Sequence, residues 1–194
     1  MDRILIMDYI IQMEKLFKFF ELTLELEEKI KLLNIKKEFN NDLNLLGCFI
    51  KDFLVIENSG KISKDENIYD DFVILFSKYQ NNSDSVNFIN KLERFSKHYL
   101  TIAFEETQDR IILSTIATVN SCFCLECYPI LMEIMDDFLN LKIDRNSFVL
   151  MLKFITDEVI KKIANENAQN LTYNELRLGI NKVLSTNFEG RLAI

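Results

Sequence analysis

The sequence predicts an all-α protein, and three observations lead to this fold class. The 194 residues include only one proline and four glycines, whereas a sheet protein of this size needs many turns built on those residues. Apolar residues recur at three- and four-residue steps over most of the chain. Helix-capping signatures precede several of these segments. We therefore expect a single domain, residues 1–194, built as a bundle of about seven to eight helices.

The first helical pattern extends from Ile4 to about Leu33 and predicts one long amphipathic helix or two helices in line. Charged residues separate the apolar positions, which are Ile4, Met7, Ile11, Leu16, Phe20, Leu24 and Ile30. A second helix is expected from about Phe39 to Ile56, followed by a loop that contains Gly60.

Capping signatures open the next two helices. Ser63 and Glu66 form a capping box, in which the hydroxyl and the carboxylate bind each other's backbone amides, and the helix after it continues through Tyr79. Asp84 is expected to cap a fourth helix, about residues 85–100.

The run from Ile111 to Leu125 contains no charged residue. It is too short and too polar to span a bilayer, so we expect a helix at the centre of the fold, buried around most of its circumference. Pro129 either kinks this helix or lies in the first turn of the next one, because proline lacks the amide that a helix interior requires.

Three further segments complete the predicted fold. The first two cover about residues 130–141 and about residues 147–167. The third is a last helix, which starts at a capping box of Thr172 and Glu175 and ends near Leu184.

The net charge of −7 disfavours nonspecific binding to nucleic acid or to an anionic membrane. Asp2 and Asp8 lie where a signal peptide would have a basic and then an apolar region, so we expect a cytoplasmic protein. Tryptophan is absent while asparagine, lysine, isoleucine and phenylalanine are frequent, which indicates an AT-rich bacterial or phage genome.

No hydrolase, transferase or di-iron template fits the sequence, and the single histidine, His98, cannot serve several roles. We expect His98 to be a surface or boundary residue near a helix end. We therefore predict that the protein is not an enzyme and carries no catalytic residues and no cofactor. A site made only of carboxylates stays open as a lower-ranked alternative.

Three of the four cysteines cluster as Cys122, Cys124 and Cys127, and the C-x-x-C spacing could present two thiolates to zinc. A fourth ligand is missing nearby. Because free cysteines are often buried and the surrounding segment is apolar, we expect a packed, reduced and metal-free cluster.

The loop after the second helix invites comparison with a calcium-binding EF-hand. If Gly60 is the sixth loop position, Glu57, Ser59 and Glu66 fall at ligand positions three, five and twelve. The first position would be Val55, which has no carboxylate to anchor the ion. A plain glycine turn followed by a helix cap explains the same residues without metal.

The stretch from Leu45 to Phe76, centred on Glu57–Glu66, resembles the helix, loop and helix of the tellurite-resistance TerB-like family. The resemblance implies an all-helical protein of bacterial stress or defence systems with acidic loop residues as metal ligands. This sequence has Ser59 where the family has an aspartate before Gly60, and residues 141–144 are a poor second copy of the motif.

The acidic residues are unevenly placed, since eight lie between Glu105 and Asp144 against two basic residues. The residues that we expect to bind a partner are Glu126, Glu133, Asp136 and Asp137. We predict a non-enzymatic module that binds a protein with a basic surface, of the immunity, antitoxin-like or defence-related kind, and self-association stays open. The alternative is a divalent-metal-binding TerB-like stress protein.

Overall fold

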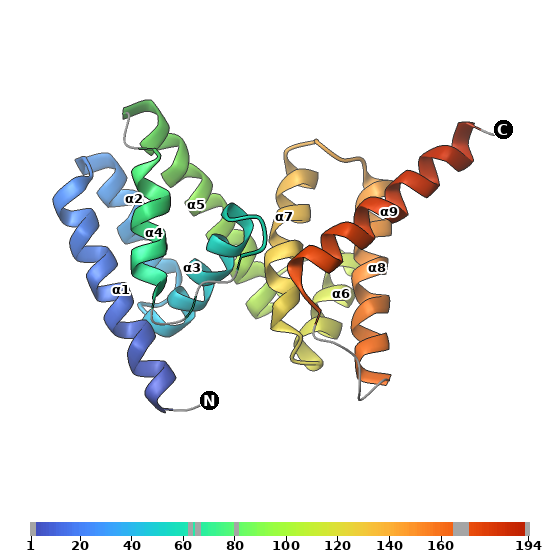
Figure 1. Cartoon of the computed structure of the whole chain (residues 1–194), viewed down its shortest axis with the longest axis horizontal. Helices are drawn as coiled ribbons and strands as arrows, with labels where there is room; N and C mark the ends of the chain where they lie inside the picture. The colour runs from blue at the N-terminus through green and yellow to red at the C-terminus, as the bar shows by residue number, and fades with distance from the viewer. Residues whose placement is uncertain (1–2, 62–63, 65–66, 80–81, 165–170, 193–194) are drawn as a thin grey trace. The chain divides into compact units, whose positions relative to one another are not determined.

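The computed structural model describes residues 3–61, 64, 67–79, 82–164 and 171–192, and in these residues it has nine α-helices and no strand (Figure 1). The all-α prediction is confirmed, with slightly more helices than expected. The helices gather into two compact units, residues 1–97 and 98–194, which are described in turn. That the two units share one folding domain stays a prediction. In the described part of the chain, no helix is long and apolar enough to cross a membrane.

The first unit is built from four helices and the first part of a fifth. These are α1 (Arg3–Thr23), α2 (Leu26–Glu38), α3 (Leu43–Glu57), α4 (Ile68–Ser77) and α5 (Asn82–Phe104), which continues into the second unit. Helix α1 lies along α3 and α4 (Figure 1). Buried phenylalanine rings meet edge to face in the core, among them Phe20, Phe53, Phe72 and Phe88. Edge-to-face packing of this kind adds to the free energy of area burial.

The segment from Ile4 to Leu33 belongs to two helices, because the helical conformation is interrupted between Thr23 and Leu26. The Glu25 amide donates to the Glu28 carboxylate at 3.0 Å, a capping interaction that starts α2. This restart shifts the helical phase. Ile30, which the pattern assigned to the core, is 49% exposed, and Leu32 with Ile35 is buried instead.

Several other helix boundaries differ from the prediction for local reasons. Helix α3 starts at Leu43 and not at Phe39, because Asn40 and Asn41 adopt left-handed conformations and Asp42 then caps the helix. Helix α5 starts at Asn82, so Asp84 lies in its first turn and is not its cap. The predicted capping box of Ser63 and Glu66 lies outside the described residues.

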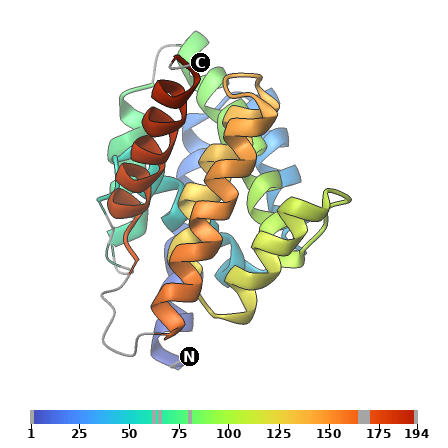
Figure 2. The same ribbon diagram turned by 90° about the vertical axis from the view of Figure 1, so that its right-hand side faces the viewer.

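The second unit contains the end of α5, α6 (Arg110–Ser121), the short 3-10 helix η2 (Leu125–Cys127), α7 (Tyr128–Leu139), α8 (Arg145–Ala164) and α9 (Tyr173–Leu192). Helix α8 lies between α6 and α9 and also contacts α7 (Figure 2). Pro129 occupies the first turn of α7, as one of the two alternatives predicted. Thr172 and Glu175 form the predicted capping box, with amide to side-chain distances of 3.0 and 3.3 Å.

The prediction of a central, all-round buried helix at Ile111–Leu125 is wrong. Helix α6 ends at Ser121 and buries only Thr115, Ile116 and Val119. Phe123 reverses the chain in a left-handed conformation and is 84% exposed. The most enclosed helix is α7, whose buried residues are Tyr128, Pro129, Ile130, Leu131, Met132, Ile134, Met135 and Asp136. The absence of charge from Ile111 to Ser121 therefore reflects serine, threonine and asparagine on this part of α6 and not complete burial.

Candidate functional site

The four acidic residues predicted to bind a partner all belong to the second unit. Glu126 lies in η2, and Glu133, Asp136 and Asp137 lie on α7. Because η2 is a 3-10 helix and α7 starts only at Tyr128, Glu126 and the other three residues do not lie on one continuous α-helix. Each carboxylate has a partner inside the unit, and these partners decide what each residue can do.

Asp136 is buried, with 3% of its surface exposed, and its carboxylate lies 3.3 Å from Nε2 of His98, which is buried as well. The expectation of a surface or boundary position for His98 is therefore wrong. Helix α5 continues six residues beyond His98 to Phe104, so this histidine is not near a helix end. Asp136 supplies the polar partner that a buried imidazole requires. Asp136 thus has little surface to offer to another protein.

Glu133 joins α7 to α9 through a group of three side chains. The Tyr173 hydroxyl donates to Glu133 at 2.6 Å, and Arg177 donates to the same hydroxyl at 3.1 Å. The Arg177 guanidinium also lies 3.5 Å from the Glu133 carboxylate. Burial, then the hydrogen bond to Glu133 and its charge, raise the pKa of Tyr173, so the phenol stays protonated as a donor.

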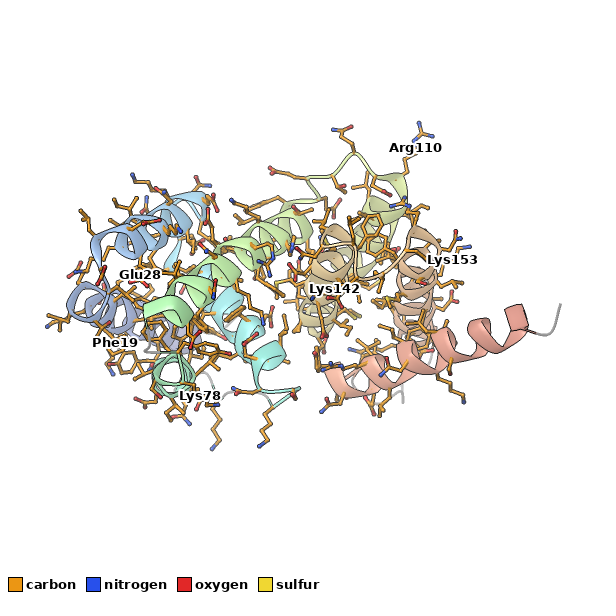
Figure 3. The ribbon with its side chains drawn as sticks, turned by 90° about the horizontal axis from the view of Figure 1, so that it is seen from above. Phe19, Glu28, Lys78, Arg110, Lys142 and Lys153 are labelled. Atoms are coloured by element: carbon orange, nitrogen blue, oxygen red, sulfur yellow. The ribbon has the colours of Figure 1, made fainter. Side chains whose placement is uncertain are left out.

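The other two predicted acidic residues form ion pairs and are themselves partly exposed. Asp137 pairs with Lys142 at 2.7 Å, and Glu126 pairs with Lys162 at 3.2 Å (Figure 3 labels Lys142). The Asp137 and Glu126 side chains are 32% and 43% exposed. The acidic excess of residues 105–144 is therefore partly balanced by bases of α8 and α9. A local count of charges could not reveal this, because the bases follow later in the sequence.

The cysteine cluster lies where α6 gives way to η2 and α7. Cys124 and Cys127 are buried, and Cys122 is half-buried. Burial raises the pKa of Cys127 to about 12 and also raises the pKa of Cys124, so both are thiols at neutral pH. Among the residues that the structure describes, no three histidine, cysteine or acidic side chains are grouped to hold a metal. The metal-free state itself stays a prediction.

The loop that resembles the TerB-like motif begins with a carboxylate that is already engaged. Glu57 pairs with Lys91 of α5 at 2.5 Å, and its side chain is only 6% exposed. Tyr79 also lies within hydrogen-bonding distance, 3.5 Å. Ser59 and Gly60 both adopt left-handed conformations, which turn the chain here. Residues 62, 63, 65 and 66 lie outside the described part, so the predicted twelfth ligand has no structural account.

A pocket in the first unit, with a volume of about 460 Å³, was not predicted from the sequence. It lies at the start of α2, and its lining combines acidic, hydroxyl and apolar residues, namely Thr23, Leu24, Glu25, Glu27, Glu28, Phe76, Ser85 and Val86. Glu28 is buried and accepts hydrogen bonds from the Ser85 hydroxyl at 2.6 Å and from the Glu25 amide (Figure 3). The spacing of Glu25 and Glu28 is a capping signal that could have located this helix start.

Comparisons of the chain with models of protein families, with curated proteins and with solved structures found no match.

Proposed function

We propose that the protein is a non-enzymatic interaction module that binds a partner protein with a basic surface. The observation that supports it is the set of part-exposed carboxylates in the second unit, Glu126, Glu133 and Asp137, within the most acidic stretch of the chain. Asp136 is left out of the binding surface because it is buried. The proposed setting is an immunity, antitoxin-like or defence-related component of a bacterium or phage.

The ion pairs at this surface do not oppose such binding. Lys142 is 61% exposed and Arg177 is 46% exposed, and exposed pairs of this type stabilise a fold by about 0–1 kcal/mol. A basic side chain of the partner can therefore replace either cation at small cost. Negative charge at the surface also steers a basic partner and raises the association rate.

The test begins with a tagged protein captured from cells of its own host and the identification of the bound protein. With both proteins purified, the double variant Glu126→Lys/Asp137→Lys should associate more slowly, and the difference should shrink as salt rises. The control is Glu14→Lys/Glu38→Lys, which makes the same change of net charge at exposed positions of the first unit. Equal affinity and equal salt dependence of wild type and the Glu126/Asp137 variant would contradict the proposal. Equal weakening in the control would attribute the effect to net charge alone.

The alternative is a divalent-metal-binding, TerB-like stress protein. The left-handed pair Ser59 and Gly60 supports it, since this turn lies at the centre of the predicted loop. The ion pair between Glu57 and Lys91 counts against it, because it occupies the carboxylate predicted as a ligand. Metal content measured on the purified protein separates the two functions, as stoichiometric calcium or another divalent ion would favour the alternative.

A further inference from the structure

Helix α2 has two apolar faces, and only one of them is covered. Leu32 and Ile35 are buried in the first unit. Leu26, Ile30 and Leu33 are 75%, 49% and 51% exposed. Steps of four and three residues place these three side chains on one face, opposite the buried one. A surface helix of a globular protein ordinarily has a single apolar stripe.

The exposed row has the spacing of a helix-pairing seam. Single exposed apolar residues are common on protein surfaces, but a row at alternating four- and three-residue steps is the pattern by which two helices pack side by side. The row is short, covering about two turns of the helix. Its natural counterpart is therefore another short helix with the same pattern.

The charges of α2 favour a second copy of the same helix in the antiparallel direction. Glu27 and Glu28 lie in its first turn, after Glu25 at the cap, and Lys36 and Lys37 lie in its last turn. When two such helices run antiparallel, the acidic end of each faces the basic end of the other, whereas a parallel arrangement sets like charges together. The two helix dipoles are also opposed favourably in the antiparallel pair.

The acidic end of α2 is also where the pocket of about 460 Å³ opens. Its described lining includes three glutamates and no lysine or arginine. Of these glutamates, Glu27 is 83% exposed, and its partner Lys31 lies 3.5 Å away within the same helix. A lysine that arrives from the basic end of a neighbouring α2 thus meets the exposed carboxylates of Glu25 and Glu27 and apolar walls that suit its aliphatic stem.

We propose that α2 is the surface through which two copies of this chain associate. The two helices run antiparallel, with Leu26, Ile30 and Leu33 of one copy packed on the same residues of the other. Lys37 of each copy lies at the acidic, Glu27-bearing end of its counterpart. Such a contact is self-complementary and closes as a twofold dimer.

The small size of the seam makes this dimer weak. Three apolar side chains and their charged neighbours cover less than the 800 Å² or so per partner of a standard stable interface. We therefore expect reversible monomer–dimer exchange with a dissociation constant of about 10–200 µM. The charged ends add a dependence on salt, and dimerisation weakens as ionic strength rises.

The first experiment is sedimentation of the full chain over a concentration range of about 5–500 µM, which brackets the expected constant. The double variant Leu26→Asp/Ile30→Asp should stay folded, because both residues are exposed, and should dimerise at least about tenfold more weakly. The matched control is Ile74→Asp/Leu178→Asp, which places the same two charges at exposed apolar positions of α4 and α9 (60% and 70% exposed) and should leave association unchanged. A wild-type chain that is monomeric throughout, or a dimer that persists in the double variant, overturns the proposal.

A charge exchange tests the direction of the two helices. Glu27→Lys and Lys37→Glu should each weaken association severalfold, because each puts like charges at both ends of the pair. The combined variant restores opposite charges and should recover most of the wild-type affinity at low salt. Folding is checked for every variant by circular dichroism. If the combined variant is as weak as the single ones while all remain helical, the antiparallel arrangement is wrong.

Discussion

The buried pair of Asp136 and His98 gives the sharpest test of the second unit, because α7 provides its own control at the next position. Asp136→Ala removes the carboxylate that lies 3.3 Å from the buried imidazole. Losing one member of this buried pair should cost about 2–5 kcal/mol. Asp137→Ala removes a part-exposed partner of Lys142 and should cost at most about 1 kcal/mol. Both substitutions raise helix propensity equally, so the comparison isolates the environment of the carboxylate.

Thermal unfolding followed by circular dichroism measures the difference. For a chain of this length, each 1 kcal/mol moves the midpoint by about 2–4 °C, so Asp136→Ala should lower it by about 4–20 °C and Asp137→Ala by less than about 4 °C. Asp136→Asn keeps an oxygen within reach of His98 and should recover part of the loss. Equal midpoints for the two alanine variants would refute the assignment of Asp136 as a structural residue.

Three further outcomes follow from single positions. Burial alone would raise the pKa of Asp109, but the hydrogen bonds from the backbone amides that it caps and from Arg145 outweigh burial and lower the pKa. The ionised Asp109 therefore stabilises the fold above about pH 4, and this stabilisation is lost as the pH falls. Asp109→Ala should cost about 0.5–2 kcal/mol in urea unfolding at pH 7, and Asp109→Asn should cost less because asparagine still caps α6. In Gly47→Ala the new methyl lies 3.1 Å from Cβ of Tyr9, which cannot rotate away, and this close contact should destabilise the fold by about 1–3 kcal/mol. The higher helix propensity of alanine offsets about 1 kcal/mol of that loss. Alkylation with iodoacetamide at pH 8 should leave Cys127 unmodified in the native protein and label it in urea, as mass spectrometry would record.

Local signals in the sequence were sufficient for the fold class and for some helix starts. Pro129 and the Thr172 and Glu175 capping box act within one helical turn, so a short window of sequence contains their whole cause. The end of α6 was missed because Phe123 adopts a left-handed conformation, which its residue type does not announce. The extent of burial along that segment was therefore overestimated.

The environment of the candidate site depended on residues far apart in the chain. Asp136 meets His98 across 38 positions, and Glu133 meets Tyr173 across 40. Such pairings depend on how the helices pack, and the residues adjacent to Asp136 and Glu133 in sequence do not indicate their partners. The sequence shows where acidic residues are concentrated, but it could not separate the buried carboxylate from the part-exposed ones beside it.

Helix α5 has a practical consequence for anyone who wishes to study the two units apart. The boundary between them, at Lys97 and His98, falls inside an unbroken helix. A fragment that began at His98 would leave the amides of its first turn without acceptors and would place this histidine in a frayed end. Asp136 would then lose His98 as its buried partner. A usable fragment of the second unit should therefore start before α5, so that the shared helix is duplicated in both pieces and not divided between them.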